Sequence, residues 1–99
     1  MDPLPSEQWQ AIPEGERDHF ERELRREIGH PGHPLAGTEC RAIARCTMCD
    51  DALFVLPGGR YAVVHLTWSG KPERGRQWPT AKTVDSWGDL ASLLAAREH

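Results

Sequence analysis

Residues 39–68 read ECRAIARCTMCDDALFVLPGGRYAVVHLTW and predict three β-strands joined by two short turns. In 39–46 and 61–68, apolar side chains alternate with polar or larger ones, and a period of two is typical of strands. The intervening run, 51–56, is mostly apolar, as expected for a central strand covered on both faces. Because turns as short as 47–50 and 57–59 do not join parallel strands, we expect a three-stranded antiparallel meander.

The alternation also assigns side chains to the two faces of each strand. In the first strand it places small apolar residues on one face, namely Cys40, Ala42, Ala44 and Cys46. In the last strand the residues expected on one face are Ala62, Val64, Leu66 and Trp68. His65 is therefore expected to face away from its apolar neighbours in the chain.

Helices are predicted on either side of the meander. Residues 16–29 place Phe20, Leu24 and Ile28 at steps of four, which is typical of an amphipathic helix, and Gly29 suits its C-terminal cap. Opposite charges recur at the same spacing, in the pairs Arg17–Glu21, Asp18–Arg22 and Glu21–Arg25. Such pairs stabilise a helix when they form.

A second helix is predicted after Ser86, which forms a short capping box with Asp89. A short helix over 6–11 and a brief fourth strand at 80–84 are further candidates. The expected fold is one α+β domain over residues 1–99, in which an N-terminal and a C-terminal helix cover the meander.

Composition restricts the classes of partner. The 99 residues carry a net charge of −3, which argues against general binding to nucleic acid or to an anionic membrane. No apolar run approaches the length of a membrane span, and the N-terminus does not resemble a secretion signal. We therefore expect a cytoplasmic protein whose three cysteines are reduced thiols or ligands.

The cysteines allow two interpretations. Cys46 and Cys49 have the spacing of half a zinc site at the turn, but no second CxxC is present, so the other ligands would have to come from Cys40, His30, His33 or His65. Alternatively, Cys40 and Cys46 are small core residues and Cys49 is exposed on the turn. The second interpretation needs fewer assumptions, so no cofactor is expected and zinc stays the alternative.

His65 is the first candidate for chemistry. If its face of the sheet lines a cleft with His33 or Asp51, acid–base catalysis would follow, because histidine titrates near neutrality. The alternative is an ordinary hydrogen-bonded histidine in the surface or core. No nucleophile with a positioned base is evident from the sequence.

The segment 68–82 is the basic region of an acidic chain, because it contains Lys71, Arg74, Arg76 and Lys82 against the single acid Glu73. Lys71, Arg74 and Arg76 lie between Trp68 and Trp78, a combination that suits phosphate groups or single-stranded nucleic acid. Alternatively, the Trp78 ring covers the sheet and leaves a solvated charged rim. The overall negative charge favours the second interpretation, so nucleic acid is a disfavoured partner.

The strings HPLAG, DDALFVL, YAVVHLTWSGKPE and DSW occur in this order over residues 30–90. In them the chain resembles a family of small bacterial proteins with an AVVHLTWSGK-type core and a downstream tryptophan helix. The resemblance implies a bacterial cytoplasmic protein and no particular activity. If the family shares a site, the matching residues are His33, Asp51, His65, Trp68 and Lys71.

Two functions are therefore considered. The first is a non-catalytic interaction module whose sheet edge or tryptophan-bearing loop docks a protein partner. The second is a small enzyme or ligand-binding protein that uses His65, with the 69–79 loop as a lid. Its candidate ligand-binding residues are His33, Asp51, His65, Trp68, Lys71 and Trp78. A cavity shared by His65, Trp68 and Lys71 would favour the second function, and His65 packed under a helix would exclude it.

Overall fold

The computed structural model describes residues 9–29, 31–47, 50–68, 70 and 79–96. The elements in chain order are β1 (Trp9–Ala11), α1 (Glu14–Glu27), β2 (Arg41–Cys46), β3 (Asp51–Leu56), the 3-10 turn η1 (Pro57–Gly59), β4 (Arg60–His65), β5 (Ala81–Val84) and α2 (Trp87–Ala96). Each strand pairs antiparallel with the next, so the five form one sheet in the order β1-β2-β3-β4-β5. This confirms an α+β arrangement with an antiparallel sheet.

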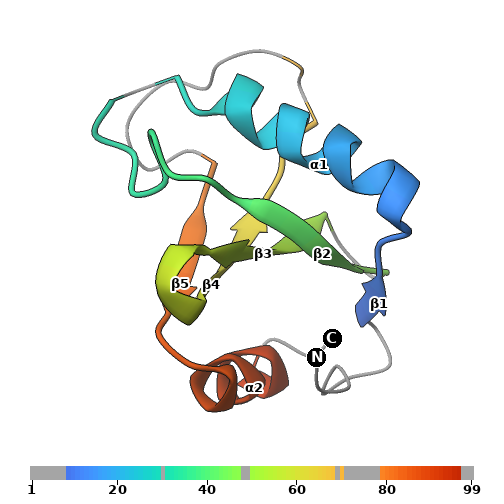
Figure 1. The fold of residues 1–99 in the computed structure, drawn as a ribbon, viewed down its shortest axis with the longest axis vertical. Coiled ribbons are helices and arrows are strands. Elements are labelled where there is room, and N and C mark those ends of the chain that lie inside the picture. Colours follow the sequence, from blue (N-terminus) through green and yellow to red (C-terminus); the bar gives the residue numbers. More distant parts are fainter. Residues whose placement is uncertain (1–8, 30, 48–49, 69, 71–78, 97–99) are drawn as a thin grey trace.

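The two helices lie on opposite faces of the sheet (Figure 1). Leu24 of α1 packs with Phe54 and Val64 on one face. Leu90 and Leu94 of α2 pack with Leu53 and Val63 on the other face. The central strands are therefore covered on both sides, as the apolar run in 51–56 predicts.

The sheet has two strands more than the predicted meander. β5, over Ala81–Val84, confirms the candidate fourth strand at 80–84. The helix predicted over 6–11 is wrong in the part that the structure describes. Residues Trp9–Ala11 form the strand β1, and Trp9 pairs with Cys46 of β2. So short a helix is marginal on its own, whereas the strand buries the Trp9 side chain to 4 % exposure.

A β-bulge at Ile43 corrects the predicted face of β2. Ala42 pairs with Phe54 and Ala44 with the adjacent Leu53, so one extra residue stands in β2. The bulge reverses the alternation, and Ala42 packs on the α1 side while Ala44 packs on the α2 side. The four small residues predicted on one face are thus divided between two faces.

The charged side chains of α1 form fewer ion pairs along the helix than predicted. Of the three predicted pairs, the described ion pairs include only Asp18–Arg22, at 2.9 Å. Glu21 instead accepts a hydrogen bond of 2.9 Å from the Ala42 backbone N–H. A carboxylate turned toward the sheet no longer reaches its neighbours along the helix, so tertiary contact overrides the local pair.

The ends of the helices agree in part with the sequence. α1 ends before Ile28, which is the C-cap in an extended conformation, so the predicted cap at Gly29 is wrong. The cap of α2 is confirmed, because the Asp89 N–H donates to Ser86 Oγ at 3.1 Å. In the part of the chain that the structure describes, neither helix combines the length and the apolar character needed to span a bilayer.

Candidate functional site

Asp51 and His65 form a hydrogen-bonded pair at one end of the sheet. They lie opposite each other in β3 and β4, and His65 Nδ1 is 2.9 Å from Asp51 Oδ1. The Asp51 side chain is 5 % exposed and that of His65 is 47 % exposed. Since a carboxylate only accepts hydrogen bonds, Nδ1 carries the proton and Nε2 is the ring nitrogen presented to solvent.

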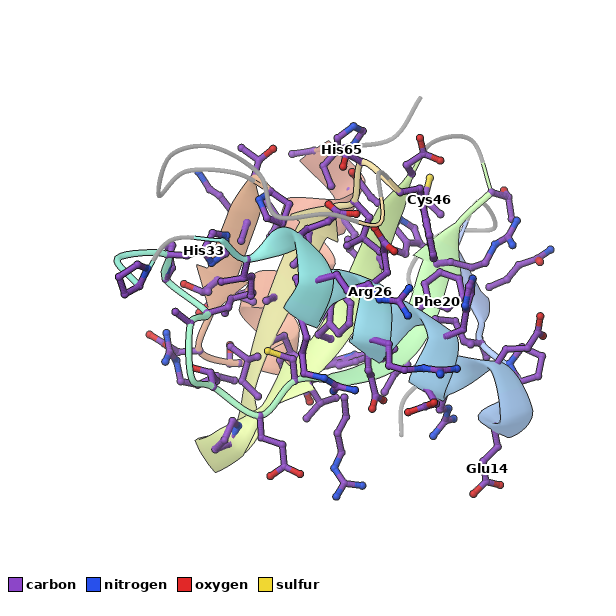
Figure 2. The ribbon with its side chains drawn as sticks, turned by 90° about the horizontal axis from the view of Figure 1, so that it is seen from above. Glu14, Phe20, Arg26, His33, Cys46 and His65 are labelled. Carbon is purple, nitrogen blue, oxygen red and sulfur yellow. The ribbon has the colours of Figure 1, made fainter. Side chains whose placement is uncertain are left out.

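A pocket of about 480 Å³ adjoins Asp51 of this pair, and we call it the strand-end pocket; His65 is not one of its lining residues. Its lining comes from α1, from the adjoining ends of β2 and β3, and from the segment after β4: Phe20, Arg45, Cys46, Thr47, Asp50, Asp51 and Trp68. The antiparallel register brings the last residues of β2 beside the first residues of β3, which explains why polar turn residues gather here. Figure 2 shows Phe20 and Cys46 on one side of the molecule and His33 on the other, with His65 at the upper edge between them.

Trp68 forms one wall of the pocket in a strained backbone conformation. Its φ is 58°, which lies in the left-handed region that a bulky side chain rarely adopts. The indole is stacked on the His19 ring at 5.2 Å and meets the Phe20 ring edge-on at 5.1 Å. Contacts with α1 therefore fix both the ring and the direction in which it faces the pocket.

Two buried glutamates of α1 hold the backbone around Trp68. The two carboxylate oxygens of Glu27 accept the N–H groups of Thr67 and Trp68, each at 2.8 Å. Glu23 Oε2 accepts the N–H of Gly70 at 2.9 Å. Exposure is 3 % for Glu23 and 0 % for Glu27, so the acceptor side of these hydrogen bonds is buried, while Thr67 and Gly70 on the donor side are exposed.

The same two carboxyl groups are hydrogen-bonded to each other, and their pKa values shift in opposite directions. Burial, together with the hydrogen bond to Glu23, raises the pKa of Glu27 from its ordinary 4.5 to about 7. Burial acts against ionisation of Glu23 as well, but the hydrogen bonds from Glu27 and the Gly70 N–H and the charge of Arg26 outweigh it and lower the pKa of Glu23. At mildly acidic pH the pair therefore holds one proton, on Glu27.

His33, a predicted site residue, is a structural anchor. Its Nδ1 accepts the Leu35 N–H at 3.0 Å, so Nε2 carries the proton and donates to the Pro79 carbonyl at 2.7 Å. The residue is 4 % exposed. Both ring nitrogens are occupied, and neither is available to bind a ligand or a metal ion.

The cysteines do not converge in the described structure. Cys46 is 3 % exposed and packs in the α2-side core, whereas Cys40 packs against the α1-side core. Burial, and secondarily the charge of Glu21, raises the pKa of the Cys40 thiol to about 11, although Arg25 opposes the change. Cys49 lies outside the described residues, and within them no group of three or more His, Cys, Asp or Glu side chains is arranged to hold a metal ion.

The structure thus brings together three of the predicted site residues, Asp51, His65 and Trp68, and separates His33 from them. Lys71, Trp78 and most of the 69–79 loop lie outside the described residues. Sequence reasoning missed Glu23 and Glu27. Their signal was present, because both share the buried stripe of α1 with Phe20 and Leu24 at steps of three and four.

Comparisons of the chain with profiles of known protein families, with curated proteins and with solved structures yield no match. The resemblance over residues 30–90 therefore stays an expectation.

Proposed function

We propose that the protein binds a small ligand in the strand-end pocket, and that this ligand carries a cationic nitrogen group on a flat ring. The observation that carries the proposal is the conformation of Trp68. Holding a bulky residue in the left-handed region costs about 1–3 kcal/mol, and such strain concentrates at binding sites. Here three backbone hydrogen bonds to buried carboxylates maintain it beside a pocket.

The charges of the pocket support a cationic ligand. Two carboxylates, Asp50 and Asp51, line it together with one guanidinium, that of Arg45. The Phe20 and Trp68 rings add aromatic surface, and aromatic faces attract cations. Negative charge beside aromatic rings favours an ammonium, guanidinium or amidinium group over a carboxylate.

His65 lies outside the pocket lining, but through its hydrogen bond to Asp51 it would add acid–base capability beside the site. Its Nδ1–H is directed to Asp51, so Nε2 can accept a proton from a bound ligand or water. A buried aspartate that orients a half-exposed histidine is the arrangement found in many enzymes that use histidine as a base. The proposal of a binding site does not depend on this catalytic role for His65.

The proposal is tested with benzamidine as the probe and benzoate as its counterpart of opposite charge. We expect benzamidine to bind saturably in the millimolar range in an NMR titration and to shift the amides of Arg45, Asp51 and Trp68. Asp51→Asn should weaken binding about fivefold, a loss of roughly 1 kcal/mol. Asp85→Asn, which alters an exposed ion pair with Arg60, is the matched control and should leave affinity unchanged.

Either of two results would refute the cationic site. One is benzoate binding as tightly as benzamidine, and the other is a loss of benzamidine affinity in Asp85→Asn as large as the loss in Asp51→Asn. An unchanged spectrum of Asp51→Asn away from the site would show that the variant is folded.

Docking of a protein partner at a sheet edge is the second candidate, and the outer edge of β5 favours it. In the described structure β5 pairs with β4 alone, so its other edge offers backbone groups for strand addition. Thr83→Pro should impair this docking and spare benzamidine binding, whereas Asp51→Asn should do the reverse. If Thr83→Pro leaves the affinity of an isolated partner unchanged, the edge is not the docking site.

A further inference from the structure

A second and larger cavity lies on the other side of α1, between the helix and the segment that leads to β2. We call it the helix–loop groove. It measures about 850 Å³, within the range of small-molecule sites. The second half of α1 forms one wall, and Pro31 with residues 35–41 forms the other.

The floor of this groove is apolar. Leu24 and Leu35 are 1 % and 2 % exposed and belong to the α1-side core, with Ile28 and Cys40 packed beside them. Burial raises the pKa of the Cys40 thiol from its ordinary 9.0 to about 11, so the thiol stays uncharged even at mildly alkaline pH. The groove thus reaches the core at its base, although Leu24 and Leu35 expose little surface there and the rest of the lining mixes polar with apolar residues.

The charged side chains on the rim are mostly engaged. Glu21 accepts the Ala42 N–H at 2.9 Å, and Glu39 pairs with Arg41 at 3.3 Å. Arg25 differs, because no hydrogen bond or ion pair joins its guanidinium to any side chain or backbone group in the described part of the chain. The groove therefore combines an apolar floor with one unpaired cation.

We propose that the helix–loop groove binds an amphiphile with a short alkyl chain and an anionic carboxylate head, with the chain over Leu24 and Leu35 and the head at Arg25. Burial of the chain supplies most of the affinity, at about 0.8 kcal/mol per methylene group removed from water. The positive charge of Arg25 favours an anionic head group. A guanidinium can hold a carboxylate through two parallel hydrogen bonds. This site is independent of the strand-end pocket.

The test uses octanoate, 1-octanol and octylammonium as probes at concentrations below micelle formation. We expect octanoate to bind saturably, with NMR shifts at Leu24, Ile28, Leu35 and Cys40, and to bind more tightly than octylammonium. Arg25→Gln should weaken octanoate about fivefold and leave 1-octanol unchanged. Arg22→Gln is the matched control, because Arg22 pairs with Asp18 on the same helix and does not line the groove.

Three results would overturn the proposal. In the binding measurements these are equal affinity for octanoate and octylammonium, equal weakening by Arg22→Gln, or the absence of saturable binding; a fourth comes from sedimentation. Ala36→Phe adds a ring to the loop wall and gives a further check: it should block all three probes in a folded protein. If sedimentation instead shows a dimer of the unliganded protein that Ala36→Phe dissociates, the groove is an interface between copies and the proposal fails.

Discussion

The carboxylate of Glu27 accepts the backbone N–H of Trp68 at 2.8 Å, and Trp68 has a φ of 58°. A buried acid on α1 thus holds the one described non-glycine residue with positive φ. The contact joins residues 41 positions apart in the chain. It fixes the tryptophan ring that walls the strand-end pocket, so the proposed site depends on a residue outside its lining.

Removing this acceptor should destabilise the fold. Glu27→Ala leaves the N–H groups of Thr67 and Trp68 without their carboxylate, and an unsatisfied buried donor costs about 1–3 kcal/mol. We expect the free energy of unfolding in urea to fall by about 2–4 kcal/mol. Asp18→Ala, at an exposed ion pair on the same helix, should cost less than about 1 kcal/mol. Equal losses in the two variants would contradict the role given to Glu27.

The raised pKa of Glu27 makes the free energy of unfolding depend on pH. Its folded-state pKa of about 7 lies above the ordinary 4.5, so its contribution is complete below pH 4.5 and is lost as the pH rises through 7. The loss should reach at most about 3 kcal/mol, because one pKa unit corresponds to 1.36 kcal/mol. Glu23, with its lowered pKa, acts in the opposite direction and only below its ordinary 4.5.

Glu27→Gln provides the check on this pH dependence, because glutamine does not ionise. Urea unfolding at several pH values between 5 and 8 should show a decline in wild-type stability that is largely absent in the variant. Glu16→Gln, an exposed position on α1, should keep the wild-type decline. A wild-type curve that is flat or rises over this range would show that Glu27 is ionised throughout.

His33 should matter for stability and not for ligand binding. His33→Ala removes partners from the Leu35 N–H and the Pro79 carbonyl, and we expect a loss of about 2 kcal/mol or more. Benzamidine affinity measured under folding conditions should not change. His19→Ala, which deletes an exposed ring, should cost about 1 kcal/mol. A stable His33→Ala variant with weakened benzamidine binding would show that His33 contributes to the ligand site.

Cys40 should react slowly with alkylating agents. Its pKa of about 11, against an ordinary 9.0, leaves roughly a hundredfold less thiolate near pH 8. Peptide mass spectrometry after iodoacetamide treatment should show alkylation at least about tenfold slower than that of N-acetylcysteine. The difference should vanish in denaturant. A native rate equal to that of the small thiol would mean that Cys40 is not buried as described.

Periodicity predicted the elements that local sequence controls. The three central strands, both helices and the Ser86 cap follow from alternation, fourfold steps and capping chemistry. The features that were missed depend on tertiary contact. The bulge at Ile43 changes the faces of β2 without interrupting its apolar pattern, and the strand over Trp9–Ala11 forms because β2 lies beside it.

The candidate site was predictable to a similar extent. Asp51 and His65 were both candidates, and their pairing follows from the register of β3 and β4. The glutamates were not found, because a glutamate within a charged helix ordinarily faces water. Only the fold shows that the segment after β4 delivers three backbone N–H groups to their side of the helix.

The most direct test of the strand-end site is the measurement of intermolecular NOEs between benzamidine and the protein at saturating probe. The account predicts NOEs from the benzamidine ring to the indole of Trp68 and the ring of Phe20, and their loss in Asp51→Asn at the same probe concentration. NOEs confined to the helix–loop groove or to α2, with none to Trp68, would contradict it.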